Sequence, residues 1–332
     1  MLGTVRVPYP EESWVLSLYL AKKGTLKLAV FKHWSGFRSL LTLTFAAFVA
    51  VVVINGGVSV AVRFSYVELP TFWGATLRFG AATIILWVLL ALFKGKIPHG
   101  RALLTSLLFG VLGVGGASSL MYWSLETIPA SLHSIIVSVV PLLTLFFAFF
   151  HRLETLNRRS VIGAFLAAGG VAIAYGGTVS GDVSVVRLLA LLLAAVCMAE
   201  AGVVMKPFAQ LNPLAVSTIA ATVGTVMIAV VSIIAGETWV LPSTAGMWWI
   251  LIYLAVGTSV LGFLLYLYVL KRWTASATSY SMVLIPLVTV VIANVLAGEQ
   301  ITWLFIIGGL LVLGGVWFGA LMPRRNYIDE KT

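Results

Sequence analysis

The stretch PLLTLFFAFFHRLETLNRRSVIGAFLAAGG, from Pro141 to Gly170, decides the fold because the chain contains it twice. At an offset of 145 residues, the stretch from Pro286 to Gly315 reads PLVTVVIANVLAGEQITWLFIIGGLLVLGG. The two stretches align without a gap. Each copy consists of two apolar runs joined by a short polar turn, which is typical of a pair of membrane helices.

The match extends upstream and reaches the first spans of each copy. At an offset of 143 residues, Arg63 falls on Lys206 and Pro70 on Pro213, so the duplication covers the whole apolar part of the chain. Duplication of this extent predicts a fold built from two similar halves. The aligned pairs of the longer match are Pro141 with Pro286, Glu154 with Glu299, Gly163 with Gly308, Gly169–Gly170 with Gly314–Gly315, Ala130–Ser131 with Ala275–Ser276, and Ser134 with Ser279.

The composition is that of a membrane protein. Of the 332 residues, 61% are hydrophobic and only 10% are charged, and the mean hydropathy is +1.07. Soluble globular proteins carry about 25% charged residues. We therefore expect a polytopic membrane protein without a soluble domain. The single cysteine, Cys197, lies inside an apolar run, so the chain has no second thiol for an intrachain disulfide.

Ten apolar segments follow the first 38 residues. Each is close to the roughly 20 residues that a helix needs to cross a hydrocarbon core. Their apolar residues are continuous rather than alternating, which excludes the strands of a membrane barrel. We therefore expect an all-α polytopic membrane protein with ten transmembrane helices. The expected spans are 39–62, 70–93, 102–123, 128–150, 160–178, 186–205, 213–235, 247–270, 274–297 and 301–322.

The distribution of Lys and Arg indicates the orientation of the spans. With a cytoplasmic N-terminal tail, the turns after spans two, four, six and eight and the C-terminal tail are cytoplasmic too. All but three of the 21 basic residues then lie on that side, the exceptions being Arg63, Arg78 and Arg187. This positive-inside pattern predicts that both termini are cytoplasmic, and it explains the net charge of +10 without nucleic acid.

Five spans per half is an odd number, so the second half enters the membrane from the opposite side. We therefore expect two inverted five-helix repeats, an architecture of many secondary transporters, with the substrate site near the midplane between the halves. The expected parts of the chain are a basic N-terminal tail at 1–38, a first repeat at 39–178, a second repeat at 186–322 and a C-terminal tail at 323–332.

The N-terminal tail contains a short apolar patch, WVLSLYL, at 14–20. The patch is too short to span a membrane and lacks a small-residue cleavage site, so we do not interpret it as a signal peptide. Two interpretations of the tail stay open. It is either a basic segment without fixed structure or an amphipathic helix on an anionic leaflet.

The doubled pattern resembles a known family. In each half a proline inside a span is followed, thirteen residues later, by a glutamate in the turn and then by a glycine-rich span. Together with the LRF stretch at Leu77–Phe79 after Pro70, this pattern is similar to the EamA family of the drug/metabolite transporter superfamily, over roughly 39–322. The first turn, HRLE, departs from the family's apolar stretch ending in Gly-Glu, which the second turn, AGE, follows more closely.

The resemblance to the EamA family implies ten helices around a central cavity. It implies that spans one to four and six to nine line this cavity, and that spans five and ten form a peripheral scaffold. It also implies transport of small metabolites, often export.

Two charged residues inside the apolar spans are the first candidates for a substrate site. Glu200 is the only carboxylate within an apolar run, and Arg78 is the matching cation in span two. A charge in the bilayer is costly and usually faces the protein interior, which makes it a functional candidate. Two alternatives stay open: Glu200 in a water-filled vestibule without a specific task, and Arg78 tying span two to carbonyls. Because their depths differ, we do not expect a direct pair.

Pro141 and Pro286 lie inside spans four and nine, where a proline frees the carbonyl four residues earlier and bends the helix. We interpret them as gating kinks that shape the cavity, against the alternative of kinks tolerated by packing. Serines precede each proline, and those of the first copy share a helix face. They either line the cavity or bond to their own backbone or to a neighbouring helix. These serines are Ser131, Ser134 and Ser138 in the first copy and Ser276 and Ser279 in the second.

Three more side chains complete the expected substrate site. His133 is the only histidine inside a span, and it is either a hydrogen-bonded packing residue or a proton relay. Asn55 lies inside span one and either lines the cavity or bonds two helices together. Tyr280 is a candidate for stacking on a substrate.

Glutamates and glycines of the repeated stretch have structural interpretations. Glu154 and Glu299 lie in turns, and we expect each to cap the N-terminus of the following helix. The set of Gly163 and Gly169–Gly170, doubled in span ten, predicts close packing of helices.

An enzyme is the first rival interpretation. Gly257–Thr258–Ser259 resembles the start of a GxSG nucleophile motif, but Val260 replaces the final glycine. The sequence contains no HExxH metal-ligand cluster and no GxxxxGK[ST] phosphate loop. We therefore expect no enzymatic activity, no metal and no cofactor. An intramembrane hydrolase and a non-transporting membrane scaffold are the alternatives to a transporter.

The expected function is secondary transport of small metabolites across the cytoplasmic (inner) membrane, by an exporter that works by alternating access. The expected partners are a small-molecule substrate and the lipid bilayer, and no nucleic acid. The sequence does not select the substrate or a coupling ion such as a proton. It also leaves open whether the glycine-rich spans five and ten form a homodimer.

Overall fold

The structure is a computed structural model in which the described part of the chain is helical. Within that part the helices are joined by turns and there is no strand, which confirms the all-α class. The chain divides into two units, Met1–Ala47 and Phe48–Thr332, and the packing reported below is that of the second. The N-terminal tail, Glu154, Ser276, Ser279 and Tyr280 lie outside the described residues. The described residues are 43–153, 158–176, 184–208, 210–270, 272 and 281–321.

Among the described residues, seven helices are long and apolar enough to cross a membrane. Two shorter apolar helices, Leu284–Ala297 and Trp303–Gly319, follow near the C-terminus. Large apolar side chains such as Phe165, Ile234 and Val295 are exposed on the outside, as expected of a surface that faces lipid. The seven helices are Leu43–Ser65, Thr71–Leu92, Arg101–Leu125, Ala130–Phe150, Val185–Phe208, Pro213–Ile234 and Ala245–Tyr266.

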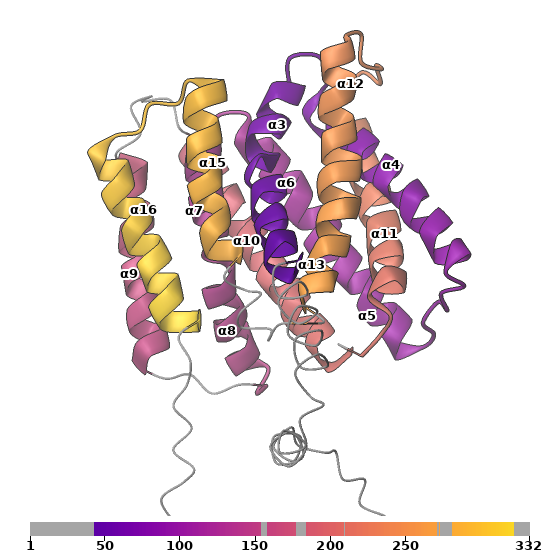
Figure 1. Ribbon diagram of the computed structural model, residues 1–332, viewed down its shortest axis with the longest axis horizontal. Helices are drawn as coiled ribbons and strands as arrows, with labels where there is room; N and C mark the ends of the chain where they lie inside the picture. Colours follow the sequence, from indigo (N-terminus) through magenta and orange to yellow (C-terminus); the bar gives the residue numbers. More distant parts are fainter. Residues whose placement is uncertain are drawn as a thin grey trace, which may run out of the picture. The chain divides into compact units, whose positions relative to one another are not determined.

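Several of these spans are divided into shorter elements, labelled in Figure 1. The elements of the first repeat are α3 (Val58–Ser65), α4 (Thr71–Leu92), α5 (Arg101–Phe109), η1 (Gly110–Gly116), α6 (Ala117–Leu125), α7 (Ala130–Val137), α8 (Val140–Phe150) and α9 (Arg158–Gly176). Those of the second are α10 (Val185–Met205), η2 (Lys206–Phe208), α11 (Pro213–Ile234), α12 (Ala245–Ile252), η3 (Tyr253–Gly262), α13 (Phe263–Leu270), α15 (Ser281–Ala297), α16 (Trp303–Val316) and η4 (Trp317–Leu321).

The third span of each repeat contains a π-helical segment. In the first repeat it is η1, between α5 and α6, and in the second it is η3, between α12 and α13. A π-helix places more residues in each turn than an α-helix, and such segments are rare and frequently occur at functional sites. Their recurrence at matching places shows that the duplication extends to a backbone irregularity.

The two aligned prolines have different consequences. Span four is interrupted before Pro141, since α7 ends at Val137 and α8 begins at Val140. The hydroxyl of Ser138, at the interruption, donates a hydrogen bond of 2.6 Å to the carbonyl of Ile135. Pro286, by contrast, lies inside α15, which continues past it to Ala297.

The glycine-rich helices α9 and α16 lie side by side (Figure 1). A Cβ atom added at Gly163 would lie 2.5 Å from the carbonyl oxygen of Gly315. One added at Gly170 would lie 2.6 Å from the carbonyl oxygen of Gly308. Because both distances are too short for a side chain, only glycine permits this approach of the two backbones. The expected close packing is confirmed for these four glycines, and their pairing makes the two helices antiparallel.

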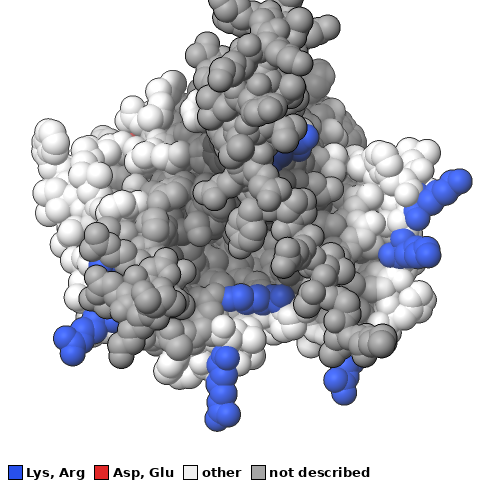
Figure 2. Space-filling model, turned by 60° about the horizontal axis from the view of Figure 1, so that its bottom comes forward, with Lys and Arg blue, Asp and Glu red and all other residues white. Residues whose placement is uncertain are grey.

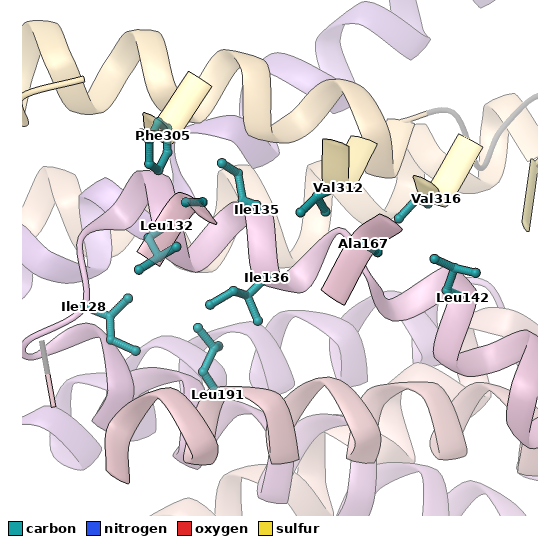
Figure 3. Packing of buried hydrophobic residues seen from close by; sticks show 11 residues of the cluster. Ile128, Leu132, Ile135, Ile136, Leu142, Ala167, Leu191, Phe305, Val312 and Val316 are labelled. Carbon is teal, nitrogen blue, oxygen red and sulfur yellow. The ribbon is translucent and has the colours of Figure 1, made fainter. Parts of the chain in front are cut away.

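The largest buried apolar cluster among the described residues surrounds span four, as Figure 3 shows. Leu132 and Ile136 of α7 are fully buried there, with Leu191 of α10 and Phe305 and Val312 of α16 in the same cluster. Inside a bilayer such packing stabilises by van der Waals contact rather than by removal from water, because lipid tails are as apolar as leucine. The cluster therefore joins span four to helices of both repeats.

Candidate functional site

A cavity of about 460 Å³ lies among helices of both repeats. This volume is within the range of about 300–1,000 Å³ that is typical of small-molecule sites. Arg78 and Asn55, two of the residues expected at the substrate site, line it. The lining residues are Val51, Asn55, Arg78, Phe79, Ala82, Leu86, Phe109, Val114, Met198, Ser217, Ala220, Ala221, Thr258, Ser259, Gly262, Tyr266, Ser281 and Ile285.

The cavity lies nearer to one end of the bundle. On α4 its lining begins at Arg78 and continues to Leu86, toward the helix end at Leu92. On α11 it begins at Ser217, about one turn after the helix start at Pro213. We call this end the basic end, and Figure 2 shows Lys and Arg side chains projecting from it. Its exposed basic residues include Lys94, Lys96, Arg101, Arg152 and Arg272.

Arg78 is held in the cavity by three hydroxyl groups. Its Nη2 donates to Thr258 Oγ1 at 3.0 Å and its Nε to Ser259 Oγ at 3.3 Å. Its Nη1 donates to Tyr122 Oη at 3.2 Å. The alternative in which Arg78 binds backbone carbonyls is therefore not what the structure shows, because all three acceptors are side-chain oxygens.

The π-helical segment η3 explains why Thr258 and Ser259 can both accept from Arg78. Both hydroxyls donate to the same carbonyl, that of Leu254, at 2.6 Å for Thr258 and 3.0 Å for Ser259. Their hydrogens are thereby used, and their lone pairs are left for the guanidinium. Ser259 was also the candidate nucleophile of a hydrolase, and its partners are Leu254 and Arg78 rather than a base.

The opposite end of the bundle carries four carboxylates, Glu68, Glu126, Glu237 and Glu299, and we call it the acidic end. Each of these carboxylates binds across the two repeats. Glu126 of the first repeat pairs with Arg187 of the second at 2.5 Å, and it also accepts from the hydroxyl of Thr71 at 2.5 Å. We call the bonds that these four carboxylates make the acidic-end contacts.

Glu237 caps a helix of the other repeat. It follows Gly236, whose positive φ of 69° ends α11 in a left-handed turn. Its carboxylate accepts from the backbone N–H groups of Phe72 and Trp73, at 3.0 and 2.7 Å, in the first turn of α4. These N–H groups have no partner within their own helix, and the helix dipole favours a negative charge beside them.

Glu299 acts in the same way on α7, and this corrects our expectation that it caps the following helix. It accepts from the N–H groups of Ala130 and Ser131 at 2.6 and 3.1 Å, and from Arg63 at 2.7 Å. The following helix, α16, is capped instead by the hydroxyl of Thr302. The expectation was wrong because a carboxylate one turn before a helix can equally reach the N-terminus of a neighbouring one.

Glu68 holds the start of α12. It accepts from the N–H groups of Ser243 and Thr244, at 2.8 and 3.2 Å, and from both of their hydroxyls. The hydrogen bond from the Thr244 hydroxyl, followed by those from Ser243 and the Thr244 amide, lowers the pKa of Glu68 from 4.5 to about 2. The carboxylate is therefore charged throughout the physiological pH range.

Glu200 lies outside the lining of the cavity, although Met198 of the same helix is part of it. Its Oε1 is 2.8 Å from Nε2 of His151, whose side chain is half exposed. Its Oε2 is buried and has no partner among the described residues. Arg78 and Glu200 thus have separate partners, which agrees with the expectation that they form no direct pair.

The serines of span four and His133 are buried, and they are not among the cavity's described lining residues. Ser131 donates to Glu299 at 2.5 Å, Ser134 to the carbonyl of Ser131 at 3.2 Å, and Ser138 to its own helix. His133 Nδ1 lies 3.1 Å from the hydroxyl of Ser59. In this conformation these side chains bond within the packing around α7.

Sequence reasoning missed the three hydroxyls around Arg78 and three of the carboxylates at the acidic end. The hydroxyls give no signal in the sequence, since Thr258 and Ser259 depend on the π-helical turn of η3 and Tyr122 comes from another helix, α6. The carboxylates give a partial signal in the sequence. A Gly-Glu pair directly after an apolar span occurs at Gly236–Glu237 and at Gly298–Glu299, and both glycines have a positive φ.

Comparison with known protein families identifies the family of this chain. The profile of the EamA-like transporter family matches the chain twice, over residues 41–176 and 186–320. The chain belongs to the EamA-like transporter family. It is thus a multi-pass membrane protein, and the resemblance seen in the doubled proline–glutamate–glycine pattern is confirmed.

Several known transporters share most of their length with this chain. The inner membrane transporter YedA of Escherichia coli K12 is 30% identical over 274 residues, covering 81% of this chain and 88% of YedA. The transporter YyaM of Bacillus subtilis is 27% identical, covering 78% of this chain and 88% of YyaM. A Streptantibioticus cattleyicolor protein named "Probable terminal-alkyne amino-acid exporter" is 27% identical, covering 72% and 80%.

One solved structure, described only as a crystal structure of a protein, matches with a TM-score of 0.63. It is 19% identical in sequence and covers 86% of this chain and 98% of its own chain. At that identity the likeness concerns the fold alone. The helical arrangement of this EamA-like transporter is therefore shared with an experimentally solved protein.

Proposed function

We propose that the protein is a secondary transporter that exports small metabolites across the cytoplasmic membrane by alternating access. The observation that carries this proposal is the pairing of a cavity toward the basic end with acidic-end contacts that join the two repeats. A cavity that lies toward one end of the bundle, with the opposite end held together, fits one of the two states that alternating access requires.

The antiparallel packing of α9 and α16 supports an inverted arrangement of the repeats. Gly163 aligns with Gly308 and Gly170 with Gly315 in the sequence, and the contacts join Gly163 to Gly315 and Gly170 to Gly308. Such exchanged contacts are what a two-fold axis between two similar, oppositely directed helices produces. Each repeat is then able to adopt the packing of the other, which moves the opening without moving the site.

Opening of the acidic end in this proposal requires the acidic-end contacts to break. A substrate drives that change only if it binds the two states with different affinity. Export is the direction that we propose, supported by the relative whose name includes an amino-acid exporter. The basic end then faces the cytoplasm, in keeping with the positive-inside pattern.

A disulfide staple at the acidic end tests alternating access. Ala130 of α7 and Ala293 of α15 are fully buried in one cluster with Val60. Oxidation of an Ala130→Cys/Ala293→Cys pair, in a Cys197→Ser background, should stop flux in proteoliposomes, and reduction should restore it. Each single-cysteine variant is the control. Undiminished flux through a fully cross-linked protein contradicts the proposal.

Direction and orientation are tested separately. Cells that overexpress the protein should gain resistance to one or more compounds of a toxic-metabolite panel, whereas an importer sensitises them. For orientation, Thr238→Cys should react with an impermeant thiol reagent added to intact cells, and Lys96→Cys should react only after the cells are opened. The reverse labelling would place the basic end outside.

A further inference from the structure

We propose that Arg78 is the subsite for a single carboxylate group on compounds whose remaining body is apolar. This inference rests on the proposed function, because it names the chemical class of the transported compound.

The described part of the chain gives Arg78 no carboxylate partner. Its five carboxylates are Glu68, Glu126, Glu200, Glu237 and Glu299, and each is bound elsewhere, at the acidic end or at His151. The other two arginines that the sequence places away from the basic end are paired, Arg63 with Glu299 and Arg187 with Glu126. A cation inside a span is costly unless a partner compensates it, and three neutral hydroxyls do so only in part.

The guanidinium of Arg78 keeps donors for a ligand. It has five N–H groups, and three of its nitrogens each donate one bond to Thr258, Ser259 or Tyr122. Both Nη atoms therefore retain one N–H that has no partner among the described residues. Those two N–H groups, on a planar fork, match the two oxygens of a carboxylate.

The hydroxyls around Arg78 make the subsite rigid. Thr258 and Ser259 are held by the carbonyl of Leu254, so they accept from Arg78 without rotating. A guanidinium fixed in this way loses little freedom when an anion binds, which increases affinity. One fixed positive charge favours a monoanion over a dianion such as a phosphate monoester.

The rest of the cavity selects an apolar body without an amine. Most of its other lining side chains are aliphatic or aromatic, among them Val51, Phe79, Leu86, Phe109 and Ile285. No Asp or Glu is among the lining residues that the structure describes. An ammonium group would therefore lose its hydration without gaining a counter-charge, so a monocarboxylate is favoured over a zwitterion or a cation.

Four probes with the same phenyl ring test this selection on the purified full-length protein. They are phenylacetate, its neutral analogue phenylacetamide, the cation phenethylamine and the zwitterion phenylalanine. Calorimetric titration should show that phenylacetate binds at least about tenfold more tightly than phenylacetamide, because only the carboxylate brings a counter-charge to Arg78 and offers two oxygens to its planar fork. The amine and the amino acid should bind more weakly still.

Variants of Arg78 test whether this residue causes the preference for phenylacetate over phenylacetamide. Arg78→Gln should bring the affinities for phenylacetate and phenylacetamide to within about twofold. Arg78→Lys should retain part of the preference, because it keeps the charge but not the fork. Arg101→Gln removes an exposed charge at the basic end and should leave the preference unchanged, which controls for long-range attraction. If Arg78→Gln does not fold, the comparison between the wild type and Arg78→Lys decides.

Three results overturn the proposal: equal or tighter binding of phenylacetamide or phenethylamine, a folded Arg78→Gln variant with the full preference, or no binding of any of the four probes. Flux in proteoliposomes separates this failure from that of the proposed function. Transport of the amide or the amine in preference to phenylacetate leaves a transporter without a carboxylate subsite. Tight phenylacetate binding without flux of any probe leaves the subsite without a transporter.

Discussion

The two repeats place similar backbones around the cavity but give it different chemistry. The first repeat contributes Asn55 and Arg78, and the aligned positions of the second, at an offset of 143 residues, are Met198 and Ala221. All four residues line the cavity. The π-helical segments and the glycine contacts, in contrast, occur in both repeats. The packing features are thus present in both repeats, whereas the charged lining residue, Arg78, is present in the first repeat only.

The largest effect is expected where the two repeats are alike, at the contact of α9 with α16. A Cβ atom at Gly308 would lie 2.4 Å from the backbone nitrogen of Ala174 and 2.6 Å from the carbonyl of Gly170. Backbone cannot move aside as a side chain does, so Gly308→Ala should lower the free energy of unfolding by about 3 kcal/mol. Thermal unfolding of the purified protein measures the change.

Gly314→Ala is the matched control, because an added Cβ there meets nothing within 4 Å. It should be neutral or stabilise by less than about 1 kcal/mol, since alanine is the better helix former. The same contrast should hold in the first repeat, with Gly163→Ala harmful and Gly169→Ala harmless. If the two members of either pair behave alike, the packing of α9 on α16 is not as described.

An intermediate effect is expected at the acidic end. Glu299 accepts two backbone N–H groups, the Ser131 hydroxyl and Arg63, and its side chain is only 9% exposed. Glu299→Gln should lower the free energy of unfolding by about 2 kcal/mol, in the range for hydrogen bonds to charged groups. It should also raise the rate at which a thiol reagent reaches Ala130→Cys in a Cys197→Ser background.

Two further variants allow the loss of stability in Glu299→Gln to be compared with that at the other acidic-end carboxylates. Glu237→Gln removes a similar cap from α4, and Glu68→Gln removes one that lies at the surface. We expect the effect on unfolding to decrease from Glu299 through Glu237 to Glu68. The opposite order would mean that the interior contacts contribute less than their geometry indicates.

The comparison of repeats also shows what the sequence can predict. Hydropathy and the duplication predicted an all-helical membrane protein and its family, because each span must satisfy its own backbone inside lipid. Charge inside a span pointed to Arg78, because such a charge needs a reason to be there. Both arguments depend on one helix at a time.

What the sequence did not predict depends on two helices at once. Thr258 and Ser259 face Arg78 only because η3 is a π-helix and lies beside α4. Glu299 caps α7 rather than α16 because the neighbouring N-terminus lies within reach of the same turn. The two prolines align in the sequence, yet only Pro141 coincides with an interruption of its helix.

A smaller effect, on transport rather than stability, is expected from these prolines. Alanine at 141 can donate the N–H that proline lacks and allow α7 to continue into α8, which removes the interruption at Ser138. Pro141→Ala should therefore slow flux severalfold while the free energy of unfolding changes by no more than about 1 kcal/mol. Radiolabelled substrate flux in proteoliposomes measures the rate.

Pro286→Ala is the counterpart in the second repeat, where α15 is already continuous. Its effect on flux should be smaller than that of Pro141→Ala. Equal effects on flux would indicate that both prolines act in a state other than the one described. A larger effect of Pro286→Ala would mean that the helix bends for transport in span nine rather than in span four.

The smallest effect concerns the pH dependence of the Glu68 contact with α12. Since hydrogen bonds from Thr244 and Ser243 lower the pKa of Glu68 from 4.5 to about 2, the carboxylate stabilises the folded state fully above pH 4.5. That contribution is lost progressively as the pH falls from 4.5 to about 2. Thermal unfolding of the wild type and of Glu68→Gln should therefore differ by a constant amount at every pH above 4.5, and the difference should shrink below it. The other carboxylates are common to both proteins and cancel in the difference. A difference that already collapses above pH 4.5 would mean that Glu68 is not held by the start of α12, and that the acidic end is joined by interior contacts alone.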